Sequence, residues 1–157
     1  LAAGEIVTSV FLPDPPPGAG SAFRKLGKRG GGWDIALVGV AAGVVLAGAG
    51  EAGGAGDPGG DGNPGEGGEA GKVADVRIAL SSVAPTPLRA RAAEAWLRGR
   101  PPSEESLAEA ARLAAEETRP ISDVRASAAY RRSLARVLAL RTLREAVSLA
   151  RQGSVAR

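Results

Sequence analysis

The chain contains no cysteine, histidine or methionine. Without cysteine it has no disulfide, no thiolate nucleophile and no thiolate ligand for zinc or an iron–sulfur cluster. Without histidine it lacks the side chain that most often serves as a general base near neutral pH. We therefore predict no catalytic residue and no metal ligand in this chain.

Aromatic residues are also scarce, with two Phe, two Trp and one Tyr among 157 residues. The apolar 44% must come mainly from alanine and aliphatic residues, enough for the core of one domain over residues 1–157. A net charge of +3, with arginines interleaved with acids, is too weak for a nucleic-acid surface. The longest apolar run is shorter than the roughly 20 residues that span a membrane, and no signal peptide is evident. We expect no nucleic-acid partner, no membrane span and a cytoplasmic location.

Four segments have the composition of strands, being rich in β-branched or aliphatic residues and separated by glycine- and proline-rich turns. They are residues 5–12, 20–28, 33–47 and 72–83. Periodicity alone does not separate a strand from a buried helix over 33–47, but its valines and glycines favour a strand. Twelve of the 24 residues in 48–71 are glycine, which predicts a flexible loop that buries little apolar surface.

The rest of the chain has helical patterns, over residues 87–98, 103–118 and 123–152. Thr86 followed by Pro87 is typical of a helix start. Strands first and helices afterwards favour an α+β fold. We expect a small antiparallel sheet of three to four strands, followed by a three-helix layer packed on one face.

The last helix is expected to begin with Asp123 or Ser122 as its cap. Its inner side is expected to be a stripe of five residues: Tyr130, Leu134, Val137, Leu138 and Val147. Capping explains Asp123 more simply than catalysis does, because no nucleophile–base pair accompanies it. Arg125 and Arg131 are expected to anchor loops or a partner subunit.

Two further ion pairs are expected to be structural. Arg29 and Asp34 bracket a glycine turn and would close it. Arg77 lies in an otherwise apolar strand, and Glu94 of the following helix is its expected partner.

Four stretches, in this order and spacing, resemble the C-terminal domain of the flavin-bearing medium subunit of molybdenum hydroxylases, the group that includes carbon monoxide dehydrogenase and xanthine dehydrogenase. They are GEIVTSV at 4–10, FRK with DIALV at 23–38, VRIAL with VAPTP at 76–87, and PISDVRAS with YR at 120–131. The resemblance covers nearly the whole chain outside the glycine-rich loop.

The resemblance implies an oxidoreductase component that passes electrons from iron–sulfur clusters through FAD to an external acceptor. The molybdopterin cofactor and the iron–sulfur clusters would lie on a large and a small partner subunit. FAD would be held mainly by an N-terminal domain that we expect to be absent from this chain, so that the isolated fragment is inactive. The alternative is a non-catalytic docking domain without direct flavin contact.

Within this family, the resemblance assigns flavin-binding positions to Val7 and Lys25. Val7 would pack near the flavin ring, and a cation at Lys25 would raise the flavin potential. Some relatives carry the lysine directly after the aromatic residue, where this chain has Arg24. Neighbours on a strand point to opposite faces, so either Arg24 or Lys25 faces the cofactor. The alternatives are a core valine and a solvated lysine.

Overall fold

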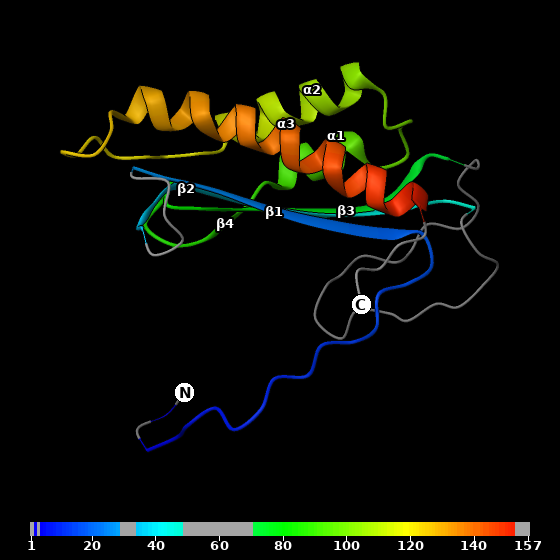
Figure 1. The fold of residues 1–157 in the computed structure, drawn as a ribbon, viewed down its shortest axis with the longest axis horizontal. Coiled ribbons are helices and arrows are strands. Elements are labelled where there is room, and N and C mark those ends of the chain that lie inside the picture. Colours follow the sequence, from blue (N-terminus) through cyan, green and yellow to red (C-terminus); the bar gives the residue numbers. More distant parts are fainter. Residues whose placement is uncertain (1, 3, 29–33, 49–70, 153–157) are drawn as a thin grey trace.

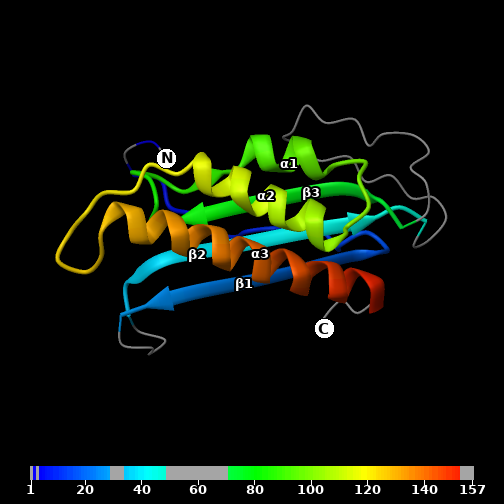
Figure 2. The ribbon, with the colours of Figure 1, turned by 90° about the horizontal axis from the view of Figure 1, so that it is seen from above.

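The computed structural model describes residues 2, 4–28, 34–48 and 71–152. Four antiparallel strands form one sheet in the order β1-β2-β3-β4. They are β1 (Ala19–Gly27), β2 (Ala36–Leu46), β3 (Val73–Ser81) and β4 (Leu88–Arg89). The helices are α1 (Arg91–Leu97), α2 (Glu104–Glu116) and α3 (Ala128–Gln152). All three helices lie on one face of the sheet (Figure 1), and α2 and α3 run across it in the view from above (Figure 2). The predicted α+β class and one-sided helical layer are confirmed.

The face of the sheet under the helices forms the core with them. Alternate residues of the two central strands point into it and are almost completely buried: Val38, Val40, Val44, Val76, Ile78 and Leu80. The helices contribute mostly small side chains, including buried Ala110, Ala111 and Ala114 of α2, and Ala139 and Ala146 of α3. A core built from alanine and valine brings backbones close together, which suits a chain with so few aromatic residues.

Helix α3 touches the backbone of β1 at Gly20. A Cβ atom built on Gly20 would lie 2.2 Å from the carbonyl oxygen of Ala146 and 2.3 Å from the amide nitrogen of Ala150. Both are backbone atoms, so no side-chain rotation relieves the contact. Glycine is required here because the helix and the strand approach so closely.

The prediction of a strand over 5–12 is wrong. This segment is extended but carries no sheet pairing within the described residues, and its apolar side chains are 63–87% exposed. A segment of this composition forms a strand only when it has a partner strand to pair with and a surface to pack against.

The predicted helix over 87–98 begins too early. Leu88 and Arg89 pair with β3 as β4, and α1 starts only at Arg91. Its first amide groups are capped by a carboxylate from elsewhere, because Ala92 N and Ala93 N donate to Glu117 Oε1 at 3.0 and 3.3 Å. Thr86 therefore does not cap this helix. The predicted end holds, since Gly99 follows with a φ of 77°.

The last helix also begins later than predicted, at Ala128. Ser127 is its cap, accepting the amide proton of Tyr130 on its Oγ at 3.2 Å. The predicted inner stripe is confirmed at Leu138 and Val147, which are buried, and wrong at Tyr130 and Val137, which are 51% and 43% exposed. Small residues such as Ala135 and Ala139 complete the buried face.

The other predicted elements are confirmed within a few residues: β1, β2, β3 and α2, the last with Ser103 as its cap. Backbone hydrogen bonds between Ala47 and residues 71 and 72 extend the pairing of β2 with β3 to the ends of the predicted loop 48–71. Residues 49–70 lie outside the described part of the chain. Arg29 does too, so its pairing with Asp34 stays a prediction.

Candidate functional site

The second face of the sheet is not covered by any described helix, and we call it the open face. The side chains that β1 directs toward it are Ser21, Phe23 and Lys25. Strand register places Gly43, Ala41 and Gly39 of β2 opposite these three, and Arg77, Ala79 and Ser81 of β3 beyond them. Over residues 39–43 the central strand β2 thus presents only glycine and alanine to the open face, between larger neighbours on β1 and β3.

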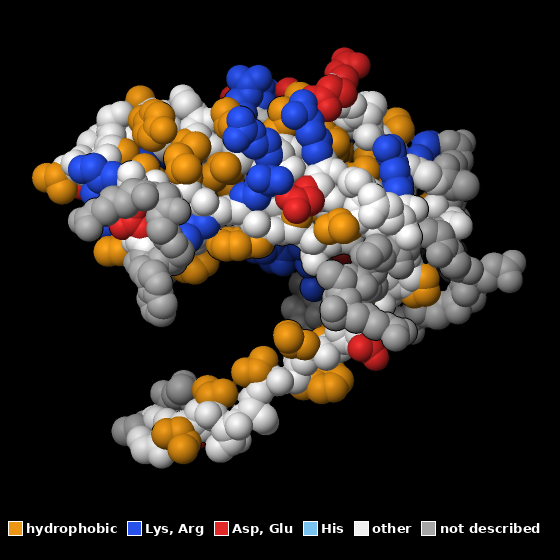
Figure 3. Space-filling view, viewed as in Figure 1, with side chains coloured by type: hydrophobic (Ala, Val, Ile, Leu, Met, Phe, Trp, Pro, Cys, Tyr) orange, Lys and Arg blue, Asp and Glu red, His pale blue; other side chains and the backbone are white. Residues whose placement is uncertain are grey.

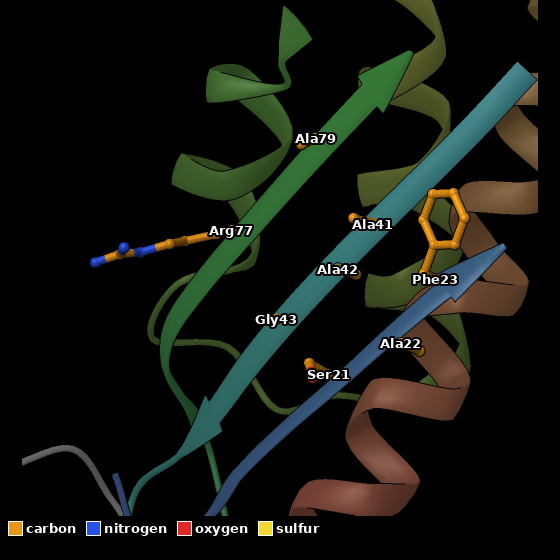
Figure 4. Close-up of a pocket in the computed structure, with 8 residues that line it drawn as sticks. All are labelled: Ser21, Ala22, Phe23, Ala41, Ala42, Gly43, Arg77 and Ala79. Carbon is orange, nitrogen blue, oxygen red and sulfur yellow. The ribbon is translucent and has the colours of Figure 1, made fainter. Parts of the chain in front are cut away.

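A hollow of about 400 Å³ lies along this strand on the open face. It is lined by Ser21, Ala22, Phe23, Ala41, Ala42, Gly43, Arg77 and Ala79, the residues shown in Figure 4. In that view the Phe23 ring stands at the β1 side, and the Arg77 side chain extends outward from β3. Its small-residue floor gives a flat, largely apolar surface of the kind that receives a planar ligand.

Two glycines of β2 give this floor different properties. A Cβ on Gly39 would lie 2.5 Å from Ser81 Oγ and 3.6 Å from the edge of the Phe23 ring, so neighbours already fill its space. A Cβ on Gly43 would meet no described atom within 4 Å, so the floor is open at that end.

Lys25 and Arg24 lie on opposite faces. Arg24 forms an ion pair with Glu145 of α3 at 2.7 Å, which fixes it on the helical side. Lys25 lies on the open face, exposed, and its Nζ donates to the carbonyl oxygen of Asp34 at 3.3 Å. Of the two cations that the sequence left open, Lys25 is therefore the one on the open face, two residues along β1 from Phe23 of the hollow.

Val7 lies in the extended segment before β1, which runs below the open face in Figure 1. Its side chain is 63% exposed. The structure places Val7 and Lys25 on the same side of the sheet but does not pack them against each other.

The predicted pair of Arg77 with Glu94 is wrong. Arg77 points to the open face, where its Nε lies 3.5 Å from Asp75. Glu94 is buried on the other side. Its Oε1 accepts hydrogen bonds from Arg89 Nε at 2.7 Å and from the amide of Ile78 at 2.8 Å. Alternation along β3 separates Arg77 from the helices, which the sequence pattern already implied.

Asp123 has a structural role, because its hydrogen bonds hold the loop between α2 and α3. Its Oδ1 accepts the amides of Arg125 and Ala126 at 2.9 and 3.1 Å and the Nη2 of Arg131 at 2.9 Å. The backbone hydrogen bond from Arg125, assisted by Arg131, lowers the pKa of Asp123 to about 2. The buried Arg131 also donates to the carbonyl oxygen of Leu37 at 2.8 Å, which confirms that it anchors this loop to the sheet.

The described residues hold no group of three or more carboxylates or other ligand side chains that could bind a metal ion. None of their helices is both long and apolar enough to cross a membrane. The sequence reading missed Phe23 and the small-residue floor. The alternation Gly39, Ala41, Gly43 was the signal that could have found it.

Comparison with known proteins decides the family. Residues 21–146 match the family model described as the CO dehydrogenase flavoprotein C-terminal domain. The chain belongs to this family. The match includes the sheet except the first two residues of β1, and most of the helical layer, and therefore both faces described above.

Relatives of known activity support the same assignment. The carbon monoxide dehydrogenase medium chain of Afipia carboxidovorans is 33% identical over 94% of this chain and 43% of its own length. The nicotine 6-hydroxylase medium subunit of Paenarthrobacter nicotinovorans is 32% identical over 93% and 42%. Reconstituted CO dehydrogenase from Oligotropha carboxidovorans superposes with a TM-score of 0.67 at 30% identity, over 87% of this chain and 40% of that one. The chain thus spans less than half the length of these relatives.

Proposed function

We propose that this chain forms the C-terminal part of the FAD subunit of a molybdenum hydroxylase complex. In this role it helps to carry electrons from iron–sulfur clusters through FAD to an external acceptor. Membership of the CO dehydrogenase flavoprotein family supports the proposal. So do the relatives, which are named as medium chains or subunits of carbon monoxide and nicotine-oxidising enzymes. The complex would operate in the cytoplasm.

The observation that carries the proposal is the open face with Lys25 at its border. Its floor of Gly39, Ala41 and Gly43 fits one flank of a planar ring system, since over residues 39–43 the central strand directs only glycine and alanine to the open face. The hollow has the size of a small-molecule site but is too open to hold a ligand alone. The remaining wall would come from the part of the relatives' length that this chain does not span.

FAD supplies the electron-accepting and electron-donating centre when bound. This chain's own contribution is electrostatic and steric. The ammonium group of Lys25 stabilises negative charge that develops at its side of the sheet and so raises the reduction potential. The apolar floor excludes water from the covered flank and strengthens that interaction. Val7, in the segment below the open face, would add an apolar contact.

The partners under this proposal are a molybdopterin-binding large subunit and an iron–sulfur small subunit. The absence of cysteine agrees with clusters held elsewhere, since thiolates are their usual ligands. The chain by itself is expected to lose FAD on purification and to be colourless. A stoichiometric flavin spectrum from this chain alone would contradict that division of labour.

The test compares Lys25→Gln with Arg24→Gln in the complete subunit. Loss of the cation on the open face should lower the flavin midpoint potential, on the order of tens of millivolts for a charge several ångströms away. Arg24→Gln removes a charge on the opposite, helical face, where Arg24 pairs with Glu145. The flavin midpoint potential should therefore stay near the wild-type value. Redox titration with FAD quantification measures both.

The alternative function is a docking domain without flavin contact. It predicts an unchanged potential and unchanged FAD content in Lys25→Gln as well as in Arg24→Gln. That result would remove Lys25 from the site and leave the open face as a surface for protein contacts.

A further inference from the structure

Asp34 lies against Lys25 on the open face. The Nζ of Lys25 donates to the backbone carbonyl oxygen of Asp34 at 3.3 Å. The side chain of Asp34 lies over Gly27, because a Cβ atom built on that glycine would be 2.8 Å from Asp34 Cβ and 3.2 Å from its Oδ2. Gly27 is two residues beyond Lys25 on β1, so the two positions share a face. The Asp34 carboxylate therefore lies on the same face of the sheet as the Lys25 ammonium group.

Glycine at position 27 permits this arrangement. A separation of 2.8 Å is closer than two non-bonded carbon atoms approach without repulsion, so alanine here would push Asp34 away from the strand. Gly27 and Asp34 are both half-buried, which reflects the close packing between the end of β1 and the segment that leads into β2. The backbone of β1 thus makes room for Asp34 beside Lys25.

The start of β2 is anchored from the helical layer. The register between β1 and β2 passes over Leu37, which has no partner on β1 and forms a β-bulge. The buried Arg131 of α3 donates instead to the carbonyl oxygen of Leu37 at 2.8 Å. Asp34 comes shortly before this anchored residue, so the fold constrains where its carbonyl oxygen and its carboxylate lie.

The other charge of β1 lies across the sheet. Arg24 points to the helical face, where it pairs with Glu145. Figure 3 shows basic side chains concentrated over this helical layer. Among the residues of β1, Lys25 is the charge on the open face, and Asp34 is the acid that lies against it. A ligand that covers this face would respond to both groups together, because nearby charges of opposite sign offset each other.

We propose that Asp34 is a positioning residue that sets the flavin potential through Lys25. Its carbonyl oxygen holds the ammonium group at the open face, and its carboxylate offsets part of the positive charge of that group. Reduction adds negative charge to the flavin, so the ammonium group favours the reduced form and the carboxylate opposes it. The pair therefore gives a potential between those that Lys25 alone or Asp34 alone would produce. The inference rests on the proposed function, since it takes the flavin to lie on the open face.

The experiment compares Asp34→Asn with Lys25→Gln in the complete, FAD-loaded subunit by redox titration. Asparagine keeps the shape and the backbone carbonyl of Asp34 but removes its charge, so the midpoint potential should rise, whereas Lys25→Gln should lower it. At a fixed ambient potential the ratio of reduced to oxidised flavin should increase about tenfold in Asp34→Asn, which is about 30 mV for a two-electron couple. Asp34→Glu keeps the charge and should stay closer to the wild type. The Lys25→Gln/Asp34→Asn double variant should fall between the two single variants.

Glu145→Gln is the matched control, because it removes a carboxylate that pairs with Arg24 on the helical face, and its potential should stay near the wild-type value. Asp34→Ala removes the same charge as Asp34→Asn with a different side chain and should also raise the potential. An unchanged or lowered potential in both variants, with the expected fall in Lys25→Gln, overturns the inference and leaves the proposed function intact. Asp34 would then serve the turn alone, as its predicted pairing with Arg29 implies. An unchanged potential in Lys25→Gln as well overturns both.

Discussion

The two faces of one sheet differ in what they require. On the helical face, β2 carries Val38, Val40 and Val44, all almost completely buried. On the open face the same strand alternates Gly39 and Ala41, side chains too small to form a core. The helical face therefore provides the hydrophobic core that stabilises the fold. The open face instead leaves a surface that no described part of this chain covers. Changes at the helical face should therefore cost stability, and changes at the open face should cost function.

Ile78→Ala should show the largest effect on stability. Ile78 is completely buried under the helices, and its truncation should lower the free energy of unfolding by about 2–5 kcal/mol. Phe23→Ala removes a larger side chain from the open face, where it is 63% exposed, and should cost about 1 kcal/mol or less. Urea denaturation of the two variants measures the difference. Equal losses would mean that the open face also contributes a core.

Two glycine substitutions should change stability in opposite directions. Gly20→Ala forces a Cβ into the backbone of α3 and should destabilise the chain by about 1–3 kcal/mol. Gly43→Ala meets open space and should leave stability unchanged or raise it by up to about 1 kcal/mol, because alanine restricts the unfolded chain. Thermal melting of both variants provides the comparison. A destabilised Gly43→Ala would show that the hollow is already filled.

Asp123 joins the helical layer to the first residues of the central strand β2 through Arg131, and its effect on stability should depend on pH. Its pKa falls from 3.8 to about 2 on folding, chiefly through the amide of Arg125. A carboxylate with a lowered pKa stabilises the fold above about pH 4 and loses this effect as pH falls toward 2. The difference in urea midpoint between wild type and Asp123→Asn should be constant at neutral pH and shrink through that window.

Other carboxylates do not obscure this measurement. Arg144 and Arg112 lower the pKa of Glu104 and Glu109, so wild type and variant lose stability together in acid. Only the difference between the two proteins reports on Asp123. A gap that persists unchanged at pH 2 would assign the effect to the shape of the side chain and not to its charge.

How much the sequence could predict depended on how local each interaction is. The strands and α2 were predictable because their alternation, glycine turns and Ser103 cap lie within the elements themselves. The start of α1 was not, because Glu117 caps it from 25 residues away. The strand predicted over residues 5–12 was wrong because strand formation needs a partner strand, and composition of one segment does not show whether a partner exists.

The candidate site divides in the same way. Alternation separates Arg24 from Lys25, but which of them faces the helices depended on the Glu145 contact from α3. The family resemblance indicated Lys25 and Val7, and the structure adds the floor of small residues between Phe23 and Arg77. What covers that floor depends on chain beyond the part present here, as the 43% coverage of the Afipia relative shows.

In the complete subunit the open face should be covered, whereas the outer side of α3 near Ser148 should stay exposed. The chain has no cysteine, so Ser21→Cys on the open face and Ser148→Cys on the outer side of α3 introduce single thiols into it. Thiol labelling, followed by mass spectrometry of the modified peptides, compares this chain with the FAD-loaded complete subunit. Labelling at position 21 should slow by at least about tenfold in the complete subunit, while position 148 labels equally fast in both. Equally fast labelling at position 21 in both proteins would show that the open face stays uncovered in the complete subunit.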